Sequence, residues 1–180
     1  TAAASAQQAG NKIRWTPQAY YYNGPFGVLA EYAESKFDII SGSNRANNVQ
    51  NNAWHVTGSW LLTGEKASFG AVKPKNVFNP DGAGWGAWEV VARYQEINLD
   101  DKLFNGFATS TNFLSSATQH ENAQAWAVGV NWYLNNNIKI AADYEDTSFD
   151  NSYSAISSSG NTSVDRPNER SLFTRLQLSY

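Results

Sequence analysis

The feature that most constrains the fold of this chain is an alternation of apolar and polar side chains with a period of two residues. The clearest run is 125–134, whose even positions are all apolar: Trp126, Val128, Val130, Trp132 and Leu134. Successive side chains of a strand point to opposite faces of a sheet, so this period predicts a β-strand. Six further runs of about ten residues show the same pattern, near 12–21, 26–32, 54–63, 88–95, 138–145 and 172–180.

The connections between these seven runs differ in length. Short turns are expected at 23–25 and 135–137, and long polar segments at 38–52, 98–122 and 150–168. Short turns at one end and long loops at the other are typical of outer-membrane β-barrels, whose short turns face the periplasm. The connection 63–86 departs from this pattern, because it lies on the short-turn side yet is long and rich in Gly and Pro.

Composition agrees with a membrane barrel and excludes other classes. Aromatic residues make up 14% of the chain, as the Trp and Tyr belts of membrane interfaces require. The formal net charge is −3, which argues against a nucleic-acid partner. No apolar run reaches the length of about 18 residues that a transmembrane helix needs, and without Cys there is no disulfide or thiolate metal site.

Seven strands cannot close a bacterial barrel, because such barrels have an even number of strands and leave no open edge in lipid. We therefore expect an all-β, antiparallel transmembrane barrel to which this chain supplies about seven strands. More protein must complete the barrel. The last strand ends on the short-turn side, which would place its end in the periplasm.

Charged side chains at inward-facing positions are candidates for lining a pore. The basic ones are Arg14, Arg93, Lys139 and Arg175, and the acidic ones are Glu31, Glu89, Asp143 and Glu145. Two interpretations remain open: a basic track that steers anions, or a mixed, solvated wall with salt bridges between neighbouring strands, which is favoured. Neither Asp143 with Glu145 nor the distant His55 and His120 makes a catalytic or metal site, so we expect no enzyme activity and no cofactor.

Three lysines in the connection 63–86 are stronger candidates for attracting anions: Lys66, Lys73 and Lys75. Pro74 fixes the backbone between two of them, and no acid is expected beside them. Exposed lysines near a pore mouth raise the local anion concentration.

Aromatic residues on the opposite, outward-facing positions are expected to anchor the strands at the level of the lipid headgroups. They are Trp15, Trp60, Trp88, Trp132 and Tyr180. The alternative for these side chains is a platform on which sugars stack.

Several sequence blocks resemble the C-terminal half of the phosphate-selective porins O and P. They are LTGE at 62–65, KPKN at 73–76, GWGAWE at 84–89, ARY at 92–94, NWYLN at 131–135 and the closing strand 172–180. The resemblance implies that residues 1–180 are the C-terminal part of one porin domain, a trimeric barrel of about 16 strands in the outer membrane of a Gram-negative bacterium. It also implies membrane lipid, the remaining N-terminal portion and small anions such as phosphate as partners.

These features are consistent with three different functions. The block resemblance favours a diffusion pore for small anions, and the net charge of −3 favours a general or cation-preferring porin. Composition alone would also fit a soluble β-sandwich module that binds carbohydrate.

Overall fold

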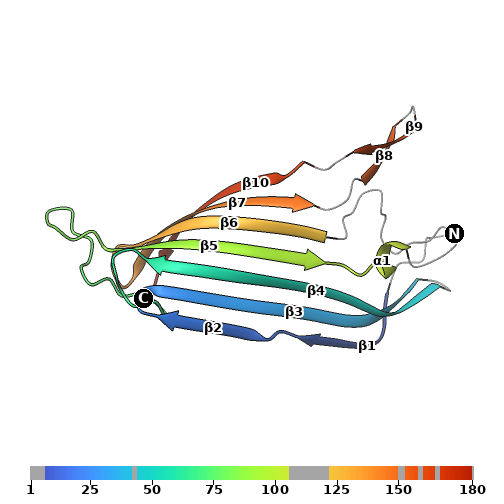
Figure 1. Ribbon diagram of the computed structural model, residues 1–180, viewed down its shortest axis with the longest axis horizontal. Coiled ribbons are helices and arrows are strands. Elements are labelled where there is room, and N and C mark those ends of the chain that lie inside the picture. The colour runs from blue at the N-terminus through green and yellow to red at the C-terminus, as the bar shows by residue number, and fades with distance from the viewer. Residues whose placement is uncertain are drawn as a thin grey trace.

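The computed structural model describes residues 7–41, 44–105, 122–149, 153–157, 160–164 and 167–179. One antiparallel sheet dominates them, its strands running side by side along the long axis (Figure 1). Its strands are β1 (Gln7–Trp15), β2 (Gln18–Asn23), β3 (Phe26–Ser41), β4 (Asn44–Leu61), β5 (Ala87–Asn98), β6 (Asn122–Tyr133), β7 (Ile138–Phe149) and β10 (Glu169–Leu178).

Three smaller elements accompany the sheet. Among the described strands, β8 (Tyr153–Ser157) and β9 (Gly160–Val164) form a separate two-stranded sheet. The helix α1 (Lys102–Asn105) is a single turn that follows β5. Within the described part of the chain, no helix has the length and apolar character needed to cross a membrane.

The sheet has the order β1-β3-β4-β5-β6-β7-β10, with β2 also paired to β3. Strands β1 and β2 lie end to end along β3, interrupted at Thr16 and Pro17. Proline cannot donate a ladder hydrogen bond, so a break at an edge strand is the place where it is tolerated. The sheet is therefore seven positions wide, which confirms the seven predicted spans.

The register separates the side chains onto two faces. Phe26 lies opposite Trp60, and Trp88 lies opposite Trp132. The even-numbered positions therefore share one face, here called the outer face, in residues 26–37 of β3, in residues 49–61 of β4 and in β5, β6, β7 and β10. The odd-numbered positions share the other, here called the inner face, where Glu89 lies opposite Asn131. In β1 and β2 the parity is reversed, because Arg14 pairs with Ser35 and Tyr22 with Gly27.

The predicted short turns are confirmed, whereas the predicted loop at 38–52 is wrong. Strand β3 continues to Ser41 and β4 begins at Asn44, so the two strands form a long hairpin. The run misled the prediction because its many Asn and Gln residues interrupt the alternation of apolar and polar side chains. A register shift opposite Asp38, where Asn48 has a φ of 53°, bends this extension.

Buried apolar side chains gather at the two ends of the sheet rather than in a central core. One cluster is Ala46, Val49 and Leu103, and the other is Leu61, Val72 and Ala87. Between them the outer face exposes large apolar side chains, for example Val56, Val128 and Leu172. None of the described helices and strands packs onto this face. A soluble sandwich would cover it with a second sheet, so that alternative does not fit.

Candidate functional site

The inner face brings together charged residues that are far apart in the sequence. Glu89 and Arg93 from β5 and Asp143 and Glu145 from β7 line one hollow of about 550 Å³ together with His55. A neighbouring hollow of about 400 Å³ is lined by Glu31, His55, Gln95 and Glu145. The structure therefore places all four predicted acids and Arg93 on one polar surface, as their parity predicted.

The acids on this surface are bonded to neutral donors. Glu89 is only 8% exposed and accepts hydrogen bonds from Asn131 Nδ2 at 2.9 Å and from the Tyr133 hydroxyl at 2.8 Å. Glu145 accepts one from Gln95 Nε2 at 3.3 Å, and Glu31 accepts one from Gln18 Nε2 at 3.3 Å. These carboxylates are thereby held against the wall.

The Asp143 carboxylate lies against the neighbouring strand β6 because its partner there is a glycine. Asp143 pairs with Gly129, and a Cβ built on that glycine would overlap Asp143 Oδ1 and lie 3.0 Å from its Cγ. The missing side chain thus leaves the space into which the carboxylate leans. A larger residue at position 129 would push the carboxylate away from β6.

The cations on the inner face are more open. Arg14, Arg93 and Arg175 are exposed, and within the described ranges none of their side chains forms a hydrogen bond or an ion pair. Lys139 is half-buried, and its Nζ lies 5.4 Å from the ring centroid of Tyr133. The wall is mixed, as the favoured interpretation expects, but within the described ranges these side chains form no salt bridges across it. The strand register places Asn, Gln and Tyr donors nearest to the acids.

On the outer face, aromatic side chains form two rows. The row at the short-turn end contains the ring pairs Phe26–Trp60, 5.8 Å between centroids, and Trp88–Trp132, 5.1 Å. The second row contains three pairs, each 5.5 Å apart: Trp15–Tyr32, Trp54–Tyr94 and Trp126–Tyr144. The rows lie six positions apart along each strand, roughly 20 Å, with mainly apolar residues between them.

Four of the predicted interface aromatics fall in these rows, and Tyr180 lies outside the described residues. Trp60, Trp88 and Trp132 belong to the first row and Trp15 to the second. The prediction omitted most of the second row, above all Trp54 and Trp126. Both could have been predicted from the sequence, because each has the parity of the outer face and lies six positions before a predicted anchor.

The connection 62–86 extends beyond the strand ends (green in Figure 1) and wraps around the rim of the sheet. On the inner side Val72, 5% exposed, packs with Leu61 and Ala87. On the outer side the ring of Phe78 lies edge-on to Trp132, 5.0 Å between centroids. The segment therefore reaches both faces at the short-turn end.

The three predicted lysines differ in their surroundings. All three are exposed, but the side chain of Lys75 is bonded, because its Nζ donates to the carbonyl of Gly64 at 2.5 Å. The carboxylate of Glu65 accepts a hydrogen bond from the Lys75 backbone N–H at 3.1 Å. The expectation that no acid lies beside these lysines is wrong, because the chain folds back between Glu65 and Lys75.

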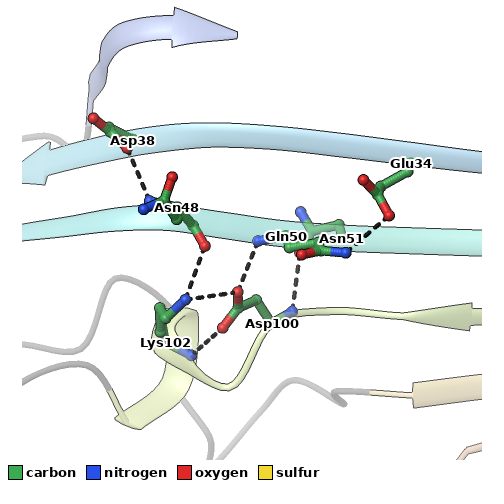
Figure 2. A network of polar contacts seen from close by, with 7 residues as sticks. All are labelled: Glu34, Asp38, Asn48, Gln50, Asn51, Asp100 and Lys102. Atoms are coloured by element: carbon green, nitrogen blue, oxygen red, sulfur yellow. Dashed lines mark hydrogen bonds and ion pairs between the residues drawn. The ribbon is translucent and has the colours of Figure 1, made fainter. Parts of the chain in front are cut away.

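The opposite rim is held by the polar network in Figure 2. Asp100 accepts hydrogen bonds from the backbone N–H of Gln50 at 2.7 Å and of Lys102 at 2.9 Å, and Lys102 Nζ donates to the Asn48 carbonyl at 2.8 Å. Partial burial raises the pKa of Asp100, but the Lys102 and Gln50 amides outweigh it, so the pKa lies below its usual range. The segment after β5 is thereby fixed onto the β3–β4 hairpin.

Asp38 extends this network. The backbone N–H of Asn48 donates to it at 2.9 Å, and Arg45 forms an ion pair with it at 3.1 Å. The Asn48 bond and then Arg45 lower the pKa of the Asp38 carboxyl. Neither this network nor any other part of the described chain groups three His, Cys, Asp or Glu side chains in a way that could hold a metal.

The sequence is similar to a known protein family and to a characterised member of it. The family described as phosphate-selective porin O and P matches residues 1–180. Porin O of Pseudomonas aeruginosa is 31% identical over 138 residues, an alignment that covers 72% of this chain and 28% of that protein. The chain thus spans well under two thirds of the relative's length.

Proposed function

Because this chain belongs to the family of phosphate-selective porins O and P, we propose that it forms part of the wall of a water-filled diffusion pore. The pore would lie in the outer membrane of a Gram-negative bacterium and pass small hydrophilic solutes without catalysing a reaction. A polar inner face and an apolar outer face bounded by two aromatic rows support this function, since they suit water on one side and lipid on the other.

A preference for small anions such as phosphate is the finer part of the proposal. The observation that carries it is the unequal exposure of opposite charges on the inner face. Arg14, Arg93 and Arg175 reach into the pore without a bonded acid in the described ranges, whereas Glu89 is buried and Glu145 accepts a hydrogen bond from Gln95. A guanidinium group in open water attracts passing anions over a Debye length of about 8 Å.

The remaining partners follow from the incomplete barrel. We propose that an N-terminal portion of the protein closes the barrel, because β1, β2 and β10 lie at the two edges of the sheet and pair with a described strand on one side alone. Lipid would cover the outer face, and three copies would assemble into a trimer.

The test is the reversal potential of the purified full-length protein in a planar bilayer under a tenfold KCl gradient, with and without millimolar phosphate. The proposal predicts a value near the chloride limit and a chloride current that phosphate reduces. Arg93→Gln should shift the potential towards zero, and the matched outer-face variant Thr174→Gln should leave it unchanged.

A general or cation-preferring pore is the second candidate. The net charge of −3 and the four acids on the inner face favour it. A reversal potential near the potassium limit, with no effect of phosphate, would establish this candidate and overturn the preference for anions.

A further inference from the structure

A buried acid holds the base of the connection 62–86. Glu65 is only 4% exposed, and its carboxylate accepts hydrogen bonds from the Thr63 hydroxyl and, at 3.1 Å, from the Lys75 backbone N–H. Lys75 Nζ donates in turn to the Gly64 carbonyl at 2.5 Å. We call these four residues the clasp. The clasp joins two points that lie ten positions apart in the sequence.

The clasp is fixed to the sheet. The Thr63 hydroxyl oxygen accepts a hydrogen bond from the backbone N–H of Trp88, the second residue of β5, at 3.1 Å. The N–H of Leu62 donates to the Trp88 carbonyl at 2.8 Å. A movement of the clasp away from the sheet would therefore break these hydrogen bonds to Trp88, at the end of the β4–β5 ladder.

The segment 66–74, which the clasp closes into a loop, crosses the inner side of the short-turn end. Its backbone bonds to the β2–β3 turn, where Ala67 N donates to the Gly24 carbonyl at 2.8 Å. The ring of Phe69 lies 5.5 Å from Tyr20 of β2, while Val72 is buried against Ala87 of β5. The segment thus spans the neighbouring strands from β2 to β5.

We propose, on the basis of the pore function proposed above, that Glu65 is a positioning residue: its clasp holds segment 66–74 at the pore mouth so that Lys66 and Lys73 face the solutes. In this assignment Lys75, whose Nζ is bonded to the Gly64 carbonyl, is a structural cation, and Lys66 and Lys73 attract anions. The clasp carries no solute itself.

The strength of the clasp depends on the ionisation of Glu65, because a carboxylate accepts hydrogen bonds more strongly than a neutral carboxyl group does. Burial raises the pKa of Glu65, but the hydrogen bonds from Thr63 and the Lys75 amide outweigh it and hold the pKa below its usual range. Lys75 is the charged group that faces this carboxylate within the described chain. A carboxyl with a lowered folded pKa stabilises the fold fully above its ordinary value of about 4.3, and the contribution is lost as pH falls through the folded value.

Trypsin tests the clasp in the detergent-folded full-length protein. The enzyme cleaves after Lys66 and Lys75, while Pro74 protects the bond after Lys73. Glu65→Gln should raise the cleavage rate in this segment about tenfold or more, because a charged acceptor is lost from a buried site. Asp100→Asn, which removes a comparable carboxylate at the opposite rim, is the matched control and should leave the rate in this segment unchanged.

The result that overturns the proposal is a folded Glu65→Gln protein that resists trypsin as well as the wild type does. If that variant does not fold, Thr63→Val decides, because it removes the hydroxyl donor and keeps the charge. It should also speed cleavage, and an unchanged rate would overturn the proposal.

Single-channel recording then separates positioning from a merely structural effect. Wild-type current should become noisier only as pH falls below the ordinary Glu pKa of about 4.3, because the pKa of Glu65 is lowered. Glu65→Gln should show the added noise at every pH. Equal pH responses in both proteins would contradict the proposal. If the pore prefers cations or does not conduct, the proposed function fails while the trypsin result still decides the clasp.

Discussion

Gly86, directly before β5, is a position at which a single methyl group should be strongly destabilising, for two separate reasons. Its φ of 71° lies in the left-handed region, where a side chain other than that of glycine costs about 1–2 kcal/mol. A Cβ there would also overlap the Tyr133 carbonyl oxygen and lie 3.2 Å from Trp132 Nε1. The strand backbone cannot move aside without disturbing the β5–β6 ladder.

The structure offers two controls that separate these effects. Gly24 also has a positive φ, 56°, but a Cβ there meets nothing within 4 Å. Gly58 has neither problem, since its Cβ would point into open space. Gly24→Ala should therefore destabilise the protein by about 1–2 kcal/mol, and Gly58→Ala should be neutral or slightly stabilising.

Gly86→Ala combines the backbone cost with a steric overlap, which typically adds about 1–3 kcal/mol. We expect a total loss of about 2–5 kcal/mol in the free energy of unfolding. Urea titration of the full-length protein in phospholipid vesicles, followed by Trp fluorescence, measures all three variants. A Gly86→Ala protein no less stable than Gly24→Ala would refute the close approach to Tyr133.

Three further predictions concern the wall and the rim. Gly129→Ala should turn the Asp143 carboxylate into the pore and weaken the preference for anions measured by reversal potential; in an Asp143→Asn background the same substitution should have no such effect. Tyr133→Phe should cost about 1–3 kcal/mol in a urea titration, because buried Glu89 loses one of its two donors. At the other rim, hydrogen exchange at the Gln50 amide, corrected for its intrinsic rate, should lose protection as pH falls below the ordinary carboxyl pKa of about 3.9, since Asp100 has a lowered pKa; Asp100→Asn should remove this pH dependence.

The period-two pattern predicted the strands and their faces because one physical cause acts along each span. A strand between lipid and water must alternate, so Trp132 and Asn131 reveal their faces from sequence alone. The pattern fails where that cause ends. Beyond the second aromatic row, polar residues such as Asn47 and Asn48 interrupt the alternation, which is why the hairpin extension around Asp38 looked like a loop.

Contacts within the candidate site were harder to predict than its faces. Parity placed Glu89 on the inner face, but only the register shows that Asn131 and Tyr133 reach it before any arginine does. The clasp depends on a chain reversal that brings Glu65 to Lys75, and no periodicity encodes that reversal. The second aromatic row, by contrast, could have been predicted from the parity of Trp54 and Trp126.

The central claim is that the inner face of this sheet lines a conducting pore, and cysteine modification tests it most directly. The chain has no Cys of its own, so Arg93→Cys on the inner face and its neighbour Ala92→Cys on the outer face can be compared in single channels of the full-length protein. A negatively charged methanethiosulfonate reagent should reduce the anion current through Arg93→Cys and leave Ala92→Cys unchanged. A current that responds in Ala92→Cys but not in Arg93→Cys would contradict the account.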